Sequence, residues 1–553
     1  MSVFAIQGLY CLHVIILFTL TVLGLSPWLS FDPFSPIRMF FLSSLSGYFL
    51  FKIYKNRHIY SSTQYRFIKY WSISWLLITV LVLIFSQTNL TLQAYGTYGR
   101  NIGLITTMSL LVILVGFSMT TEIKHVNQIL LALITIGGVT MLYGFAQSLN
   151  VDPLRISKGA IPASSFFGNI NFYSAILGIC SLALLGFLKE IVKNKILILV
   201  SLIYLLSGVV AIIRSQSQQG FFVLLIGSGS FVLLLLFKKY KYGVRFLLPL
   251  ISLAISSITI IAGFLQKGPL VNLLYQDSIT YRGDYWRAGL KIISDYPLLG
   301  IGFDSFGDYY FRYRDLTSTT RRGPLISTNS AHNYFIDYAA EGGLFLFVLY
   351  LAAIAFTILS YIKIFKREEV LNLKITALLA LWIGFQAQAL ISPRQISLLV
   401  IGWTTSGLII GYELSTRSEN EFKNNQIMST VREHKITKSG GAISIMLGAA
   451  ICLPHFTADM QVKSAITSLN LEKIYASAFR KPQDPNRMVY IANNLQAQGF
   501  NQEAIKILEQ TVEIAPDNFD AWKLFSLIST ATAEQKSIAT ENMKRLDPNN
   551  PDL

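Results

Sequence analysis

Residues 196–237 read ILILVSLIYLLSGVVAIIRSQSQQGFFVLLIGSGSFVLLLLF, and this stretch decides the class of fold. It contains two apolar runs, 196–213 and 220–237, which a short polar turn separates. Each run approaches the length of about 20 residues that an α-helix needs to cross the hydrocarbon core of a bilayer. Because uninterrupted apolar runs of this length are typical of transmembrane helices, the stretch predicts a pair of them.

The same pattern extends over the whole chain of 553 residues, which is 52% hydrophobic and 14% charged with a mean hydropathy of +0.49. Soluble chains usually contain about 25% charged residues, so an ordinary cytosolic enzyme and a disordered protein are excluded. We predict an all-α, polytopic membrane protein with about 12–13 transmembrane helices. The expected spans are 8–26, 36–51, 71–87, 101–119, 127–149, 170–188, 196–213, 220–237, 246–264, 336–362, 375–392, 396–412 and 440–454, of which the last is the shortest.

The net charge of +16 comes from 46 Lys and Arg against 30 Asp and Glu. In a soluble protein this excess would suggest a nucleic acid or another polyanion as partner. If the N-terminus is cytoplasmic, however, most basic residues of the short loops lie inside, for example Lys189, Lys193 and Lys238. The excess is then a topology signal. We expect no nucleic-acid partner, a multi-pass protein of the inner (plasma) membrane, and a periplasmic position for residues 265–335 and 455–553.

The predicted domains are 1–264 with nine transmembrane helices, 265–335 as a large outer loop, 336–454 with four more helices, and 455–553 as a C-terminal helical domain. Residues 488–518, MVYIANNLQAQGFNQEAIKILEQTVEIAPDN, show two bursts of helical periodicity on either side of Gly499, and Pro516 closes the unit. Pro482 lies 34 residues earlier. This resembles the tetratricopeptide repeat, a 34-residue helical hairpin whose stacked units present a binding surface. A protein partner is therefore expected here, and a plain helical hairpin domain is the alternative.

The outer loop 265–335 contains the candidate functional residues. His332 lies there in S-A-H-N, and an imidazole suits general base catalysis because it titrates near neutrality. The alternative is an interfacial His with a backbone hydrogen bond. Arg282 and Arg287, together with further Arg in the loop, favour an anionic ligand, although six Asp in the loop oppose it. No Cys or His pair has the spacing of metal ligands, so we expect no metal cofactor.

Several motifs resemble the bacterial O-antigen ligase and polymerase superfamily. They are R-G-D-Y-W-R-A-G-L (282–290), D-Y-P-L-L-G-I-G-F-D-S-F (295–306), A-H-N-Y-F (331–335) and E-G-G (341–343), with S-F-F-G-N-I-N-F-Y-S (165–174) and Y-G-R-N-I-G-L (98–104) upstream. The resemblance covers about residues 8–413. It implies transfer of a glycan from an undecaprenyl-diphosphate donor to an acceptor, such as lipid A-core, on the outer face of the membrane, without a metal.

The resemblance also implies roles for matching residues. Arg282 matches the motif Arg that binds the diphosphate, and His332 matches the His proposed as base for the acceptor hydroxyl, with inversion at the anomeric carbon. Asn333 completes the His-Asn pair and is a candidate for substrate binding, and Arg100 is a further outer candidate for the same role. Many members carry S-R-G after the seventh span, but here the segment is S-Q-S-Q-Q-G, so Gln219 stands at the Arg position. Arg214, five residues earlier, could replace it if the loop folds back.

Three enzymes remain open: a ligase, a polymerase of O-antigen or exopolysaccharide, and a protein O-oligosaccharyltransferase. A polysaccharide transporter is less favoured, because it predicts ionisable residues at mid-span depth, whereas those in this chain gather at span ends. A non-catalytic scaffold for the C-terminal domain is the third class.

Overall fold

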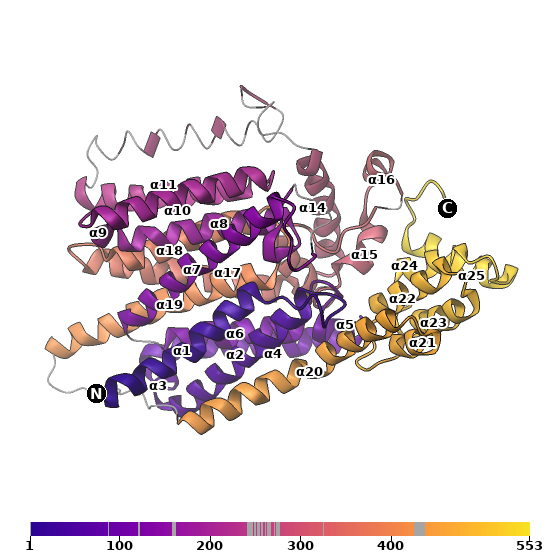
Figure 1. The fold of residues 1–553 in the computed structure, drawn as a ribbon, viewed down its shortest axis with the longest axis horizontal. Coiled ribbons are helices and arrows are strands. Elements are labelled where there is room, and N and C mark those ends of the chain that lie inside the picture. Colours follow the sequence, from indigo (N-terminus) through magenta and orange to yellow (C-terminus); the bar gives the residue numbers. More distant parts are fainter. Residues whose placement is uncertain are drawn as a thin grey trace.

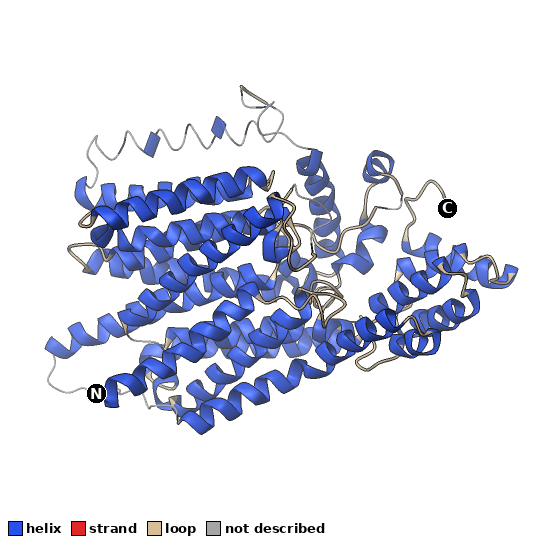
Figure 2. Ribbon diagram, in the orientation of Figure 1, coloured by secondary structure: helices blue, strands red, loops and turns tan. Residues whose placement is uncertain are grey.

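All regular elements of the described part of the computed structural model are helices (Figure 2). The structure describes residues 2–553 except 87, 120–121, 157–161, 325, 425–436 and most of 241–276. The expected span 246–264 therefore lies outside the described residues.

The helices up to residue 240 supply the first half of the bundle. They are α1 Ser2–Leu23, α2 Ser35–Lys55, α3 Arg57–Tyr60, α4 Arg66–Phe85, α5 Leu90–Tyr95, α6 Leu104–Ser118, α7 Ile123–Ser148, α8 Ile170–Leu182, α9 Leu188–Ile191, α10 Lys195–Arg214 and α11 Gln219–Tyr240, with short 3-10 helices η1 Thr63–Tyr65, η2 Ser165–Phe167 and η3 Ala183–Phe187.

The remaining helices form the outer loop, the rest of the bundle and the C-terminal domain. They are α14 Asp277–Asp295, α15 Phe306–Tyr313, α16 Leu316–Arg322, α17 Tyr334–Arg367, α18 Leu373–Ala389, α19 Ile396–Asn424, α20 Lys438–Ser468, α21 Leu471–Ala478, α22 Pro485–Ala497, α23 Asn501–Ile514, α24 Phe519–Leu527 and α25 Ala533–Leu546.

Eight helical segments within the described residues are long and apolar enough to cross a membrane: 63–85, 123–148, 170–191, 195–214, 219–240, 334–367, 396–417 and 439–468. Shorter apolar helices at 12–23, 104–118 and 373–389 coincide with three more expected spans. The expected span 36–51 forms α2, which is a helix of 21 residues but is not among the eight. The prediction of a polytopic helical membrane protein is confirmed.

Different helices and different kinds of residue lie at the two ends of the bundle. The long helices lie roughly side by side, with the N-terminus, α3 and α9 at one end and α14 to α16 at the other (Figure 1). The C-terminal helices α21 to α25 continue from this second end. Lys189 lies in α9 and Lys193 follows it, so these basic residues and the outer-loop helices occupy opposite ends of the bundle.

The thirteenth expected span is longer than its hydropathy suggested. Helix α20 runs for 31 residues, through Pro454 to Ser468, so the expected domain boundary at 454/455 falls inside a helix. Beyond Pro454 the buried residues Ala458, Asp459, Val462 and Ala465 still follow a helical period. The continuous apolar run in the sequence ends near Pro454, whereas the helical periodicity of buried residues continues to Ala465.

Helix α20 also packs very closely against α2. A Cβ at Gly47 would overlap the carbonyl of Ser444, and one at Gly448 would overlap the carbonyl of Ser43. Each helix thus presents a Ser and a Gly four residues apart at the contact. Such small residues allow transmembrane helices to approach closely, and they explain how α20 belongs to the bundle.

A break in α17 shapes the outer end of the bundle. Gly343 has φ 67° and ψ −177°, so the helix is interrupted and backbone groups around it lose their helical partners. The segment 297–302 supplies new ones: Ile301 N–H donates to Ala340 O at 3.0 Å, Gly302 N–H donates to Glu341 O at 2.9 Å, and Leu344 N–H donates to Pro297 O at 2.8 Å. A broken helix is tolerated at a membrane when its freed groups find protein partners. The P-L-L-G-I-G and E-G-G motifs are therefore two halves of one structure.

The C-terminal domain consists of two helical hairpins, α22 with α23 and α24 with α25, preceded by α21. Gly499, at φ 88°, forms the turn of the first hairpin, as its place in the sequence predicted. The hairpins share an apolar core that includes Met488, Leu495, Leu508 and Phe525. The helical hairpin is thus observed, whereas its kinship with tetratricopeptide repeats stays a prediction.

We expect Gly343→Ala to lower the stability of the protein by roughly 2–5 kcal/mol, because a Cβ there would overlap the carbonyl of Leu298 and L residues rarely adopt its φ. Thermal unfolding in detergent micelles measures the effect. Gly138→Ala in α7 is the control, since its Cβ would meet nothing closer than 3.9 Å. An equal melting temperature for Gly343→Ala and the wild type would contradict the role given to the break.

Candidate active site

His332 lies in the S-A-H-N turn that joins the outer loop to α17. Its φ is 55°, which is uncommon for a residue with a side chain, and its N–H donates to Ser330 Oγ at 2.9 Å. Asn333 is the N-cap of α17, where its Oδ1 accepts from Phe335 N–H at 2.9 Å and Ile336 N–H at 3.3 Å. The side-chain oxygen of Asn333, which we expected to bind substrate, thus holds the start of the helix.

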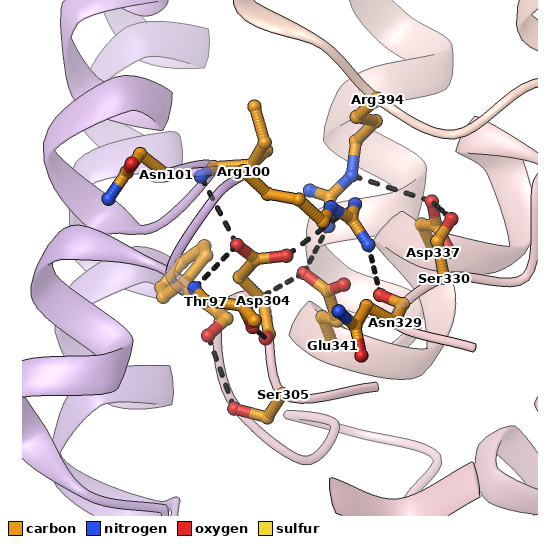
Figure 3. A network of polar contacts seen from close by, with 12 residues as sticks. Thr97, Arg100, Asn101, Asp304, Ser305, Asn329, Ser330, Asp337, Glu341 and Arg394 are labelled. Carbon is orange, nitrogen blue, oxygen red and sulfur yellow. Dashed lines mark hydrogen bonds and ion pairs between the residues drawn. The ribbon is translucent and has the colours of Figure 1, made fainter. Parts of the chain in front are cut away.

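Three buried charged residues fix this turn (Figure 3). Asp337 accepts from Ser330 Oγ at 2.7 Å and from Ala331 N–H at 2.8 Å. Arg394, from the loop between α18 and α19, lies with Nε 3.6 Å from Asp337 Oδ2 and pairs through Nη2 with Glu341. None of the three side chains is more than 1% exposed. Because buried charges require partners, the position of Arg394 determines that of Asp337, and Asp337 determines the turn that carries His332.

The network continues to the motif at 98–104 through Asp304 (Figure 3). Asp304 N–H donates to Glu341 Oε2 at 2.8 Å, and Asp304 Oδ2 accepts from Thr97 N–H at 2.8 Å. Arg100 places Nη2 3.5 Å from Asp304 Oδ1 and donates through Nη1 to the carbonyl of Asn329. Motifs from three distant parts of the sequence thus converge beside the His332 turn.

The positive charges of three arginines affect the pKa of His332. Its pKa is lowered to about 3, first by burial and then by the positive charges of Arg282, Arg100 and Arg322. Each of these guanidinium groups comes from a different element: α14, the 98–104 segment and α16. The structure therefore brings together His332, Arg282 and Arg100, which were predicted, and adds Arg322. At neutral pH the imidazole is uncharged and can accept a proton.

Arg282 has capacity to bind a further group. Its Nε is buried without a hydrogen-bond partner among the described residues, and burial is the main reason that its pKa is lowered. The Nε of Arg100 is likewise buried and unpaired within the described part. By contrast, Arg322 donates to the Tyr285 hydroxyl and lies over the Tyr281 ring at 4.5 Å. Unpaired buried guanidinium donors are costly, and a bound anion with several acceptor oxygens would satisfy them.

Two other predicted residues lie apart from this cluster. Arg287 pairs with Asp284 and donates to Asp315 at 2.7 Å, with a side chain that is 47% exposed. It forms an ion-pair network with these two carboxylates, and no contact among the described residues links it to His332. Arg214 is the last residue of α10 and is exposed, and it makes no ion pair with any described residue.

Gln219 reaches the site from the side of α11, which it begins. Its Oε1 accepts from Ser392 Oγ at 3.3 Å, two residues from Arg394, and its Nε2 is buried without a partner among the described residues. The segment before it contacts the 165–174 motif, since Ser217 Oγ donates to Asn171 Oδ1 at 2.7 Å. These two upstream motifs therefore meet each other next to the loop that supplies Arg394.

Sequence reasoning missed Arg394, Asp337, Glu341 and Asp304 as parts of the site. Asp337 and Glu341 were visible as carboxylates at the start of an apolar helix, where an ionisable residue calls for a partner. Arg394 lies in a short loop between two apolar helices, so it was a candidate to pair with these carboxylates. Within the described residues, no group of three or more His, Cys, Asp and Glu side chains is arranged to hold a metal ion.

Residues 202–351 match the family described as O-antigen ligase. The matched segment contains Arg214, Gln219, Arg282, His332 and the broken part of α17. No curated protein matches the chain. The family match supports a membrane protein of the O-antigen ligase superfamily, whose members are glycosyltransferase-like ligases.

We expect Arg394→Gln to destabilise the protein by about 3–5 kcal/mol, because two buried carboxylates would lose their cation. Melting temperature in detergent is the measurement. Arg545→Gln is the matched control: its pair with Asp517 is 46% and 35% exposed, and such pairs contribute about 0–1 kcal/mol. If both variants melt at the same temperature, the His332 turn does not depend on Arg394.

Proposed function

We propose that this multi-pass membrane protein, whose residues 202–351 match the O-antigen ligase family, is a glycosyltransferase. It transfers a glycan from an undecaprenyl-diphosphate donor to an acceptor, lipid A-core or a similar glycolipid, on the outer face of the inner membrane, with inversion and without a metal. The observation that carries the proposal is the buried Nε of Arg282, which has no hydrogen-bond partner among the described residues, together with the neutral His332 on whose pKa Arg282 acts.

The proposed reaction needs two kinds of group, and the site offers both. An acceptor hydroxyl attacks the anomeric carbon, its proton passes to the neutral imidazole of His332, and the bond to the diphosphate oxygen breaks with the electron pair on that oxygen. Charge therefore develops on the leaving diphosphate. Arg282 and Arg100, with unpaired guanidinium nitrogens among the described residues, are positioned to stabilise it.

The donor itself would activate His332. Without substrate, the three arginines and burial keep the imidazole a weak base. A bound diphosphate brings negative charge next to the same arginines, offsets their effect and raises the pKa of His332 towards its usual range. The base then gains strength when the donor is in place, which protects the site from unproductive protonation.

The position of the site supports the proposed topology. Helices α14 and α16, which carry Arg282 and Arg322 of the His332 cluster, lie at the end of the bundle opposite α9, which contains Lys189 (Figure 1). Since basic loops face the cytoplasm, the cluster would face the periplasm, where lipid-linked glycans are assembled onto acceptors. The charged residues of the site form one network at that end, a pattern that favours surface chemistry over a transport path across the bundle.

A polymerase and a protein O-oligosaccharyltransferase of the same superfamily would use the same Arg and His groups. A deletion strain separates the three by the glycans that accumulate. Full-length polymer that is not linked to its acceptor indicates the ligase, single repeat units on the acceptor indicate the polymerase, and loss of glycoproteins alone indicates protein glycosylation.

We expect His332→Ala and Arg282→Ala each to reduce glycan transfer by at least about 100-fold, since removal of a general base or of a charge-stabilising donor has effects of this size. Expression and membrane insertion should persist. Lys291→Ala, on the same helix as Arg282 and paired with Asp315 at the surface, is the control and should transfer normally. Normal transfer by His332→Ala would remove His332 from the role of base.

The pH dependence of kcat/KM tests the charge environment of His332. The base is active when neutral, and its pKa of about 3 places the loss of activity well below pH 6.5. Arg322→Gln removes one nearby cation, raises the pKa of His332 and should move the acidic limb to higher pH. An acidic limb near pH 6.5 in the wild type, or identical profiles for both proteins, would contradict this assignment.

A further inference from the structure

A cavity of about 520 Å³ lies between the outer face of the bundle and the C-terminal domain. One wall contains Asn329, α15 and the turn at 97–98, and the other wall is formed by α22 and α24. Its volume falls within the roughly 300–1,000 Å³ of small-molecule sites. Arg100 donates to the carbonyl of Asn329, three residues before His332, so one wall of the cavity is in contact with a residue of the candidate active site.

The C-terminal hairpins turn the same face of their first helices to this cavity. On α22, Asn486, Val489, Tyr490 and Asn493 line it with the spacing of one helical face. On α24, Asp520, Lys523 and Leu524 do the same. The lining residues of the C-terminal domain therefore belong to one face of α22 and one face of α24.

The lining is rich in amide groups that are available for binding. The side chains of Asn329 and Asn493 are exposed to the cavity and make no hydrogen bond with any described residue. Each amide offers two donors and an acceptor close together, which matches neighbouring hydroxyl groups that both donate and accept. Asn518 Nδ2 donates to Asn486 Oδ1 at 2.9 Å, which orients a second pair of amides.

Aromatic and acidic side chains complete the site. Tyr490 is 41% exposed, and its ring is supported from one side by Phe31 at 4.6 Å between centroids. A supported ring offers a flat apolar face for the C–H face of a sugar. Asp308 and Asp520 outnumber Lys523 in the lining, which disfavours an anionic ligand such as the diphosphate. Burial is the main cause that raises the pKa of Asp308 to about 7, so this group can also donate a hydrogen bond near neutral pH.

We propose that this cavity binds a short, uncharged oligosaccharide segment, with Asn493, Asn329 and Tyr490 as its principal contacts. The inference rests on the proposed function, and it gives the enzyme a sugar-binding subsite whose lining includes neither Arg282 nor Arg100. The segment belongs either to the donor glycan or to the acceptor. A peptide is the less favoured occupant, because four of the lining residues are Asn and two are Asp, and these groups pair better with sugar hydroxyls than with the apolar side chains that anchor a peptide.

Binding to the full-length protein in lipid nanodiscs tests the proposal, measured by calorimetry and saturation-transfer NMR. Two probes are used: the oligosaccharide released by mild acid from the lipid-linked donor, and the delipidated acceptor glycan from a deletion strain. We expect at least one probe to bind, and Asn493→Ala to raise its Kd about three- to tenfold, the value of one hydrogen bond. Tyr490→Ala should weaken binding of this probe further. The probe that binds identifies the source of the segment.

Asn494→Ala is the matched control. Asn494 is the next residue on α22, its Nδ2 donates to Tyr490 O at 2.8 Å, and it does not line the cavity. The Asn494→Ala protein should bind the oligosaccharide as tightly as the wild type does. Equal melting temperatures of the three variants exclude misfolding as the cause of a difference.

Binding of neither oligosaccharide, or binding that is unchanged in Asn493→Ala and Tyr490→Ala, would overturn the inference. Tight binding of a Ser/Ala/Lys decapeptide that Asn493→Ala abolishes would overturn it in favour of a peptide. His332→Ala separates this outcome from the enzyme proposal. If His332→Ala loses transfer while no oligosaccharide binds, the cavity inference alone fails. If His332→Ala keeps transfer while Asn493→Ala weakens binding, the catalytic proposal alone fails.

Discussion

The buried contact of Arg394 with Asp337 and Glu341 is the interaction on which the outer end of this protein depends. A charge that leaves water has a large desolvation cost, and these three groups offset it only by pairing with one another. The pairing fixes the first turns of α17 against the loop before α19. Through Ser330 and Asp304 it also sets the His332 turn and the 98–104 segment. One interaction thus links α17 and the loop before α19 to the turn that carries His332 and to the segment that carries Arg100.

The broken α17 follows from the same need to satisfy buried polar groups. A helix that passes from the bilayer into an ordered outer loop can be interrupted if another segment takes up its free backbone groups. The segment 297–302 does this at Gly343, and Gly300 allows the close approach, because a Cβ there would overlap the backbone of Ala340 and Glu341. The interruption places Glu341 where it meets both Arg394 and the N–H of Asp304. The glycine motifs are thus structural, and the reactive groups lie beside them.

The arginines around this buried contact have different roles. Arg282 and Arg100 retain unpaired donors next to a neutral His332, an arrangement suited to an anionic leaving group and a proton acceptor. Arg287 and Arg314 instead stabilise the outer loop, and Arg314 does so by a buried pair with Asp547 of the C-terminal domain. This pair ties the hairpins to the outer loop.

The sequence by itself determined the transmembrane character, the approximate spans, the hairpin at Gly499, and Arg282 and His332 as candidates. Hydropathy and helical periodicity are properties of about 20 neighbouring residues, so they can be read locally. Only the tertiary structure decided that Arg394 pairs with Glu341 across 53 residues, that Gln219 contacts Ser392, that Arg287 is bound at the surface, and that α20 continues to Ser468. These features depend on which distant side chains share a buried environment, because the energy of a charge or amide is set by its partners and not by its neighbours in the chain.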